Sequence, residues 1–122
     1  RRARILVVDD EPMMCRALAR MLGSEHETLA TTDPLDAVRR IESGERFDLV
    51  LSDVAMSGMT GIALHGLLAK TAPELAERML FMTGGALTPA AAVFLDSLSD
   101  RVLEKPLTAD VVRSAVARAL QP

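Results

Sequence analysis

The chain has 122 residues, of which 49% are hydrophobic and 25% are charged, and its formal net charge is −3. This length and composition fit one globular domain with its own hydrophobic core. A mildly acidic chain without a long basic run gives no electrostatic reason to expect nucleic-acid binding or direct membrane contact. No apolar stretch is long enough to cross a bilayer, nothing resembles a signal peptide, and a single cysteine excludes an internal disulfide.

The first half of the chain predicts two strand–helix pairs. The aliphatic run 4–8 has the pattern of a strand that is covered on both faces. A helix follows from Pro12, whose missing N–H is not needed in a first helical turn, and Gly23 closes it. Residues 26–31 form a partly polar strand, which favours a place at the edge of a sheet. An aspartate then caps a helix over 34–43.

Three further strand–helix pairs complete the pattern. The expected strands are 47–52, 78–82 and 101–104, and the expected helices are 62–71, 89–98 and 109–120. Pro73 stops the first of these helices, Gly84 and Gly85 form a flexible turn, and Thr88 and Thr108 act as N-caps. The alternation predicts an α/β fold, with a doubly wound five-stranded parallel sheet of flavodoxin-like order 2-1-3-4-5 and helices on both faces.

Five polar residues lie at or just past the ends of these strands: Asp9, Asp10, Asp53, Thr83 and Lys105. The predicted strand order places the three acids at the switch point between strands 1 and 3, where ligands of such sheets bind. Clustered carboxylates raise each other's pKa unless a cation joins them. Mg²⁺, or Mn²⁺ in its place, is a suitable occupant because it is a hard cation that prefers oxygen ligands.

Asp53 has a second role open to it, because a carboxylate can accept a phosphoryl group. A hydroxyl from Thr83 and an ammonium from Lys105 would then hold the phosphoryl oxygens. Taken singly, a strand-end Asp is a turn residue, a Thr favours strands, and a Lys is a surface charge. Their coincidence at one sheet edge is what favours a site for phosphoryl transfer.

Four stretches carry a family resemblance: VVDDEP (7–12), LVLSDVAMSGMTG (49–61), LFMTGG (80–85) and LEKP (103–106). The chain resembles the receiver domain of bacterial two-component response regulators over about residues 4–120, and most of all the C-terminal receiver module of hybrid sensor histidine kinases. The resemblance implies that Asp53 is the phosphoacceptor. It also assigns Thr83 and Lys105 to the phosphoryl oxygens and implies a cis peptide bond between Lys105 and Pro106.

The resemblance further implies a metal site. Asp10, Asp53 and the backbone carbonyl of Ala55 are the direct Mg²⁺ ligands by this likeness, and Asp9 acts mainly through water. Two positions depart from the family pattern. Ser57 replaces a proline, which predicts a somewhat more mobile loop. Val102 replaces the aromatic residue that usually signals phosphorylation, and the chain has no Tyr or Trp.

These observations lead to a phosphoacceptor module, residues 1–122, as a single receiver domain excised from a longer chain. It takes a phosphoryl group from a histidine kinase or a histidine phosphotransfer domain onto Asp53, with Mg²⁺, and loses it by autodephosphorylation. We expect no enzyme activity beyond this self-catalysed transfer, a cytoplasmic domain whose parent histidine kinase can be membrane-anchored, and at most a weak homodimer.

Alternatives remain open at this point: a stand-alone response regulator, a pseudo-receiver that never turns over, a Mg²⁺-dependent phosphatase and a nucleotide or flavin binder. The phosphatase lacks its usual D-x-D pattern, and the binder lacks a phosphate-cradling loop. We expect Cys15 to have a packing role. His26 and His65 are expected at surface or loop positions, and neither has the setting of a kinase phosphohistidine.

Overall fold

The computed structural model describes residues 2–85 and 87–122. Five strands form one parallel sheet in the order β2-β1-β3-β4-β5. The strands are β1 Arg4–Val8, β2 Glu27–Thr31, β3 Leu49–Asp53, β4 Met79–Thr83 and β5 Val102–Glu104. The predicted fold class, the strand order and the edge position of the second strand are confirmed. The predicted bounds of the last four strands are one or two residues off.

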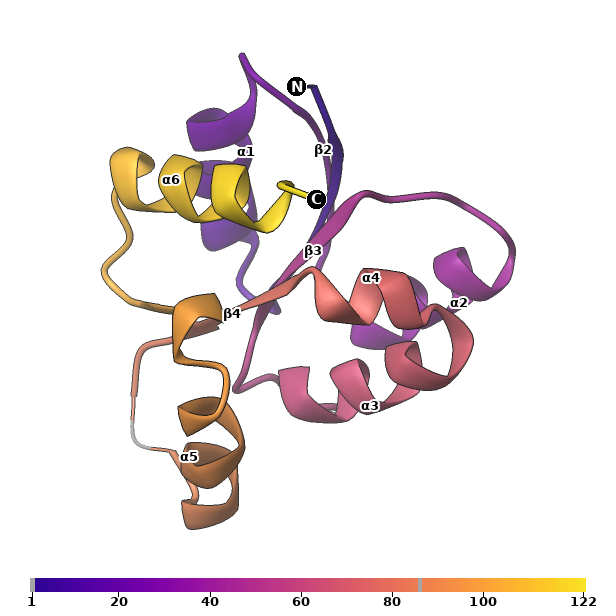
Figure 1. Ribbon diagram of the computed structural model, residues 1–122, viewed down its shortest axis with the longest axis vertical. Helices are drawn as coiled ribbons and strands as arrows, with labels where there is room; N and C mark the ends of the chain where they lie inside the picture. The colour runs from indigo at the N-terminus through magenta and orange to yellow at the C-terminus, as the bar shows by residue number, and fades with distance from the viewer. Residues whose placement is uncertain (1, 86) are drawn as a thin grey trace.

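Helices cover both faces of the sheet (Figure 1). On one face lie α1 Pro12–Leu22 and α6 Ala109–Ala119, and on the other lie α2 Pro34–Glu42, α3 Gly61–Thr71 and α4 Pro73–Glu77. Between β4 and β5 the chain forms α5 Pro89–Asp96 and a short 3₁₀ helix, η1 Ser99–Arg101. In the described part of the chain, no helix has both the length and the apolar character that crossing a membrane requires.

The helix starts follow from side-chain caps. Asp33, Thr88 and Thr108 each accept a hydrogen bond from a backbone N–H of the first helical turn, as predicted. Thr60 caps α3 in the same way. Each cap satisfies a backbone donor that has no partner within the helix.

Pro73 differs from the prediction, which treated it only as the stop of a helix. The structure ends α3 at Thr71 and begins α4 at Pro73, so that Ala72 lies between two helices. A proline cannot continue a helix because it has no N–H, but the same property suits the first helical position. One residue therefore ends one helix and starts the next.

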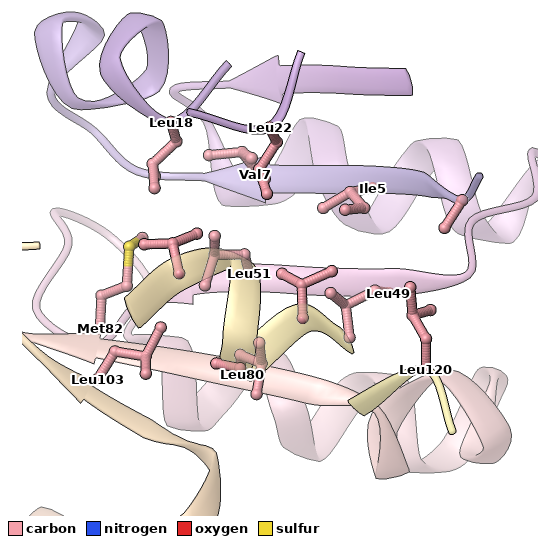
Figure 2. Close-up of a cluster of buried hydrophobic side chains, with 14 of the residues drawn as sticks. Ile5, Val7, Leu18, Leu22, Leu49, Leu51, Leu80, Met82, Leu103 and Leu120 are labelled. Atoms are coloured by element: carbon pink, nitrogen blue, oxygen red, sulfur yellow. The ribbon is translucent and has the colours of Figure 1, made fainter. Parts of the chain in front are cut away.

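The core divides into two clusters because successive strand side chains point to opposite faces of the sheet. Figure 2 shows the cluster beneath α1 and α6, where Ile5 and Val7 of β1 meet Leu18 and Leu22 of α1. The alternate residues of the strands pack on the other face, against α2, α3, α4 and α5. Phe81 is the largest fully buried side chain there. Because helices cover both faces of the sheet, a ligand can reach the strands only at their ends.

Candidate functional site

The strand register brings the predicted residues to one level at the carboxyl end of the sheet. Val8 of β1 pairs with Ser52 of β3. The residues that directly follow them, Asp9 and Asp53, therefore lie side by side. Thr83 ends β4 and pairs with Glu104, the residue before Lys105. The backbone N–H of Lys105 also donates to the Thr83 carbonyl at 2.7 Å. Neighbouring parallel strands therefore set the spacing of the site.

The three acids form a compact cluster. One carboxylate oxygen from each of Asp9, Asp10 and Asp53 lies within 4.8 Å of the others. Asp9 is completely buried, Asp53 is 6% exposed and Asp10 is half-buried. Oxygen donors at this spacing suit a hard divalent cation such as Mg²⁺, which is usually held by a few carboxylates together with water. The donor set therefore fits the metal that the sequence predicts.

The Lys105 side chain reaches into this cluster. Its Nζ lies 3.4 Å from Asp53 Oδ1 and 3.5 Å from Asp9 Oδ2. The peptide bond between Lys105 and Pro106 is cis, as the family resemblance implies. A compact ammonium beside an acceptor carboxylate is placed to bind an anionic group that becomes attached there.

Burial and charge shift the protonation of both partners. Burial raises the pKa of the Asp53 carboxyl, and repulsion from Asp9 and Asp10 raises it further, while Lys105 opposes both effects. Burial of the Lys105 ammonium lowers its pKa, but attraction to Asp9 and Asp53 and hydrogen bonds to them outweigh burial, so its pKa lies above the ordinary value. The site thus holds more negative charge than its single ammonium compensates, which favours the entry of a cation.

Backbone donors fix two of the acids. The Glu11 N–H donates to Asp9 Oδ1 at 2.9 Å, and the Ser57 N–H donates to Asp10 Oδ2 at 3.1 Å. Ser57 occupies the position where the family usually has proline, and a proline has no N–H to give. The substitution therefore ties the loop after β3 to the acidic cluster, a contact that the sequence analysis did not foresee.

Gly61 is a second residue whose role the sequence analysis missed. It begins α3, is buried, and donates its N–H to the Val54 carbonyl at 2.9 Å. A Cβ at this position would lie 2.4 Å from the carbonyl oxygen of Asp53. Only glycine lets the helix start approach the backbone of the acceptor so closely. A TG pair at a predicted helix start gives no signal of such an approach.

For Thr83 and Ala55, the structure gives a position near the acidic cluster and leaves their roles untested. Thr83 is 9% exposed at the end of β4, beside the strand that carries Asp53. Ala55 is exposed and lies two residues after Asp53 in the loop that Ser57 ties to Asp10. Their roles toward a phosphoryl group and a metal remain predictions.

Two cavities lie outside the acidic cluster. One of about 550 Å³ is at the opposite end of the sheet, where Phe47 and Pro73 line it. The other, of about 320 Å³, lies beside the loop that follows Asp53, and Val54 and Thr88 are among its small or apolar lining residues. Neither lining includes an acid of the cluster or the lysine, but the second cavity reaches the site at Ala55.

Cys15 and His26 are buried and have structural roles. The Cys15 thiol is buried and donates to the Asp9 carbonyl at 3.3 Å, and burial raises its pKa, as suits a packing role. His26 lies in the loop before β2, but its ring is buried and its Nδ1 accepts the Ala3 N–H at 3.0 Å. The backbone N–H of Ala3 needs an acceptor, which explains why a histidine is buried at this place.

His65 is half-buried in a helix, so of the two expected positions, surface or loop, the loop is ruled out. This residue lies in the middle of α3, and its ring centroid is 5.8 Å from that of Phe81 and 5.4 Å from that of Phe94. The aromatic contacts draw the imidazole toward the second core cluster. Val102, which replaces the family's aromatic residue, packs half-buried against the same cluster.

Comparisons with known proteins agree with this geometry. The chain is 36% identical over 114 residues to the sensor histidine kinase RcsC of Salmonella typhimurium, a match that covers 93% of this chain and 12% of that kinase. It is also 36% identical over 118 residues to the response regulator protein FleR of Pseudomonas aeruginosa, covering 95% of this chain and 24% of FleR. The chain thus spans a small part of each curated relative.

Solved structures show the same fold. The signal receiver domain of a signal transduction histidine kinase from Syntrophus aciditrophicus is 32% identical, with a TM-score of 0.76 over 97% of this chain and 89% of that chain. A response regulator receiver domain protein from Clostridium thermocellum has a TM-score of 0.81 at 23% identity, over 97% and 94% of the two chains. The family model of the response regulator receiver domain matches residues 5–117, and the chain belongs to this family of two-component signalling domains.

Proposed function

We propose that this domain accepts a phosphoryl group on Asp53 from a phosphohistidine of a histidine kinase or a histidine phosphotransfer domain. The observation that carries the proposal is the position of Lys105 Nζ, 3.4 Å from Asp53 and 3.5 Å from Asp9, beside a cluster of three carboxylates. An ammonium and a cation-binding group on either side of one carboxylate meet the charge requirements of phosphoryl transfer.

The proposed transfer exchanges a P–N bond for a P–O bond. A carboxylate oxygen of Asp53 attacks phosphorus, the P–N bond to the donor imidazole breaks, and the imidazole leaves with the bonding electron pair. In autodephosphorylation a water oxygen attacks phosphorus, the Asp53 O–P bond breaks, and inorganic phosphate leaves. Lys105 and Thr83 bind the phosphoryl oxygens in both steps. Asp9, Asp10, Asp53 and the Ala55 carbonyl would hold Mg²⁺ or Mn²⁺, which supplies positive charge to the incoming group.

The domain is proposed as one part of a hybrid sensor histidine kinase. The support is the similarity of this chain to RcsC. Its identity to FleR, a response regulator, is also 36%. By itself the domain would be no enzyme beyond the self-catalysed transfer, would reside in the cytoplasm and would contact neither nucleic acid nor membrane. A stand-alone response regulator is the alternative for the parent chain, and a pseudo-receiver is the alternative for the chemistry.

The test is phosphorylation with a small donor. The domain is incubated with phosphoramidate and Mg²⁺, and intact mass spectrometry is used to look for one phosphoryl group, about 80 Da. Asp53→Asn should abolish the adduct, and Asp96→Asn, a matched change at an exposed aspartate in α5, should retain it. A wild-type domain that forms no adduct with either Mg²⁺ or Mn²⁺ would favour the pseudo-receiver and contradict the proposal.

A further inference from the structure

The His65 imidazole joins three separate elements of the fold. Its ring centroid lies 5.8 Å from that of Phe81 in β4 and 5.4 Å from that of Phe94 in α5, and the two phenyl rings meet edge to face at 6.1 Å. Phe81 is completely buried, whereas His65 and Phe94 are half-buried. We call these three residues the ring cluster. Through the ring cluster, α5 is attached to α3 and to the sheet.

Few other side chains attach α5 to the domain. The structure describes all eight residues of this helix, and Leu95 is the one among them that is buried. Val93 on the same helix is 75% exposed, and in Figure 1 α5 lies at the margin of the molecule. Segments with few buried apolar contacts open at a lower free energy than the core does. The ring cluster therefore supplies a large share of what keeps α5 closed.

The charged groups around the His65 ring favour its neutral form. Burial lowers the pKa of His65, the guanidinium of Arg101 in η1 lowers it further, and a hydrogen bond with the backbone of Ala76 in α4 opposes both effects. The other charged residues on the elements around the ring are all exposed, and none of them is a cause of this shift: Lys70, Glu74, Glu77, Asp96, Asp100 and Glu104. A protonated His65 would thus be a second cation beside Arg101, without an anionic partner among the described residues.

Water can reach a protonated ring most easily if α5 moves. Phe81 belongs to a strand that lies between two others, and Arg101 joins η1 to α4 by donating to the carbonyls of Ala76 and Glu77. An unpaired charge is costly to bury, and α5 is the wall of the ring cluster with the fewest buried residues. The lowered pKa of His65 means that closure is fully favoured above the ordinary histidine pKa and weakens as the pH falls through it toward the lowered value.

We propose that His65 is a pH-sensitive switch for α5: its neutral ring holds α5 closed against α3 and β4, and a proton on the ring releases α5 while the sheet stays folded. The proposal goes beyond phosphoryl transfer and does not depend on it. Ala90 and Ala91 of α5 line the cavity of about 320 Å³ that also reaches Ala55, beside the proposed phosphoacceptor. Release of α5 would therefore open that cavity.

The test is amide hydrogen exchange of the ¹⁵N-labelled domain, followed by NMR at pH 7.5 and pH 5.0 and corrected for the intrinsic effect of pH on exchange. In the wild type, the protection factors of α5 amides should fall about fivefold or more at pH 5.0, and those of β4 amides should not. His65→Phe keeps an aromatic ring that cannot be protonated, so its α5 protection should stay constant. His26→Gln removes the other histidine and keeps an acceptor for the Ala3 N–H, so its α5 should respond as in wild type.

A second measurement needs no variant. The resonances of the His65 ring titrate with pH in the wild-type spectrum, and their midpoint should coincide with that of the α5 amide shifts. The proposal is overturned if the two midpoints differ, if α5 keeps its protection at pH 5.0, or if β4 loses protection together with α5. It is also overturned if the response of α5 survives in His65→Phe, which would assign the response to another group such as Asp53, whose pKa is raised. None of these outcomes involves phosphorylation, so they leave the proposed phosphoacceptor function standing.

Discussion

The two ends of the sheet arrange their charges in opposite ways. From α2 to the amino ends of β1 and β2, five side chains alternate in sign: Asp36, Arg40, Glu45, Arg4 and Glu27. Consecutive members are joined by ion pairs of 2.9, 3.2, 2.9 and 2.6 Å. At the carboxyl end, three carboxylates lie within 4.8 Å of one another and share the ammonium of Lys105 at 3.4–3.5 Å. Like charges are thus separated at one end and gathered at the other.

Protonation shifts at the two ends have opposite signs. A hydrogen bond from Arg4 lowers the pKa of Glu45, and one from Arg40 lowers the pKa of Asp36. Burial and repulsion from Asp9 raise the pKa of Asp53. For a carboxyl group, a lowered pKa means that the ionised form favours the fold, and a raised pKa means that it opposes the fold.

We interpret this difference as a division between ion pairs that stabilise the fold and charges that serve the proposed phosphoryl transfer. The side chains of the amino-end pairs are 24–57% exposed, so solvent screens them and each pair stabilises the fold only slightly. At the carboxyl end the ionised Asp53 costs stability, as expected where a site is kept ready for a ligand and activity is traded against stability.

Removing the ammonium should affect the chemistry far more than removing an amino-end guanidinium. Lys105→Ala is expected to slow phosphorylation of Asp53 by about 100-fold, since it deletes one preorganised charge that faces the phosphoryl oxygens. Arg40→Ala should leave the rate within about twofold of wild type. Both rates are measured by intact mass with phosphoramidate and Mg²⁺. A similar loss in the two variants would show that the ends are not functionally distinct.

Magnesium should stabilise the domain through the carboxyl end alone. At a free concentration of about ten times its dissociation constant, the ion should add about 1.4 kcal/mol to the free energy of unfolding. Asp10→Ala should lose most of this gain, whereas Asp36→Ala should keep it. Denaturant unfolding with Mg²⁺ and with EDTA gives the comparison. Equal stabilisation of both variants would mean that the ion binds elsewhere.

Asp53→Asn should make the metal-free fold more stable, by about 1 kcal/mol. The raised pKa of Asp53 means that its ionised form opposes folding at neutral pH, so the gain should be present above that raised pKa and shrink as the pH falls through it. Asp36→Asn should instead lower the melting temperature, because it breaks an ion pair with Arg40. Melting in EDTA across pH 4–8 measures both. If Asp53→Asn proves less stable than wild type, the repulsion argument is wrong.

Sequence patterns predicted the sheet, its order and the meeting of the candidate site residues at one edge, because those depend on simple regularities. Aliphatic runs alternate with capped helices, and parallel strands bring their carboxyl ends to one edge. Strand ends were less accurate, since Asp53 and Thr83 belong to their strands through backbone pairing that their polarity does not reveal. The second role of Pro73 was missed because one residue can both end and begin a helix.

Contacts that depend on distant parts of the chain left no sequence signal. The Ser57 N–H reaches Asp10, 47 residues away, only because β1 and β3 are neighbours. His65 joins Phe81 and Phe94 through the packing of α3 on the sheet, which neither periodicity nor composition singles out. The same is true of the amino-end ion pairs, in which Arg4 meets Glu45 across 41 residues.

That amino-end network should give the smallest effect and the most sensitive check of the comparison. Glu45 contacts both Arg4 and Arg40, so Glu45→Gln should lower the melting temperature slightly at low salt and leave phosphorylation unchanged. Molar salt should reduce the difference, because ion pairs that solvent reaches are screened. Because the pKa of Glu45 is lowered in the fold, the ionised Glu45 stabilises the domain at every pH above the ordinary carboxyl pKa. This stabilisation is lost as the pH falls through the lowered pKa. Asp53→Asn has the opposite sign at neutral pH, so melting both variants over one pH series should give two curves that approach wild type from opposite sides. Curves on the same side would mean that the two ends of the sheet use charge in the same way.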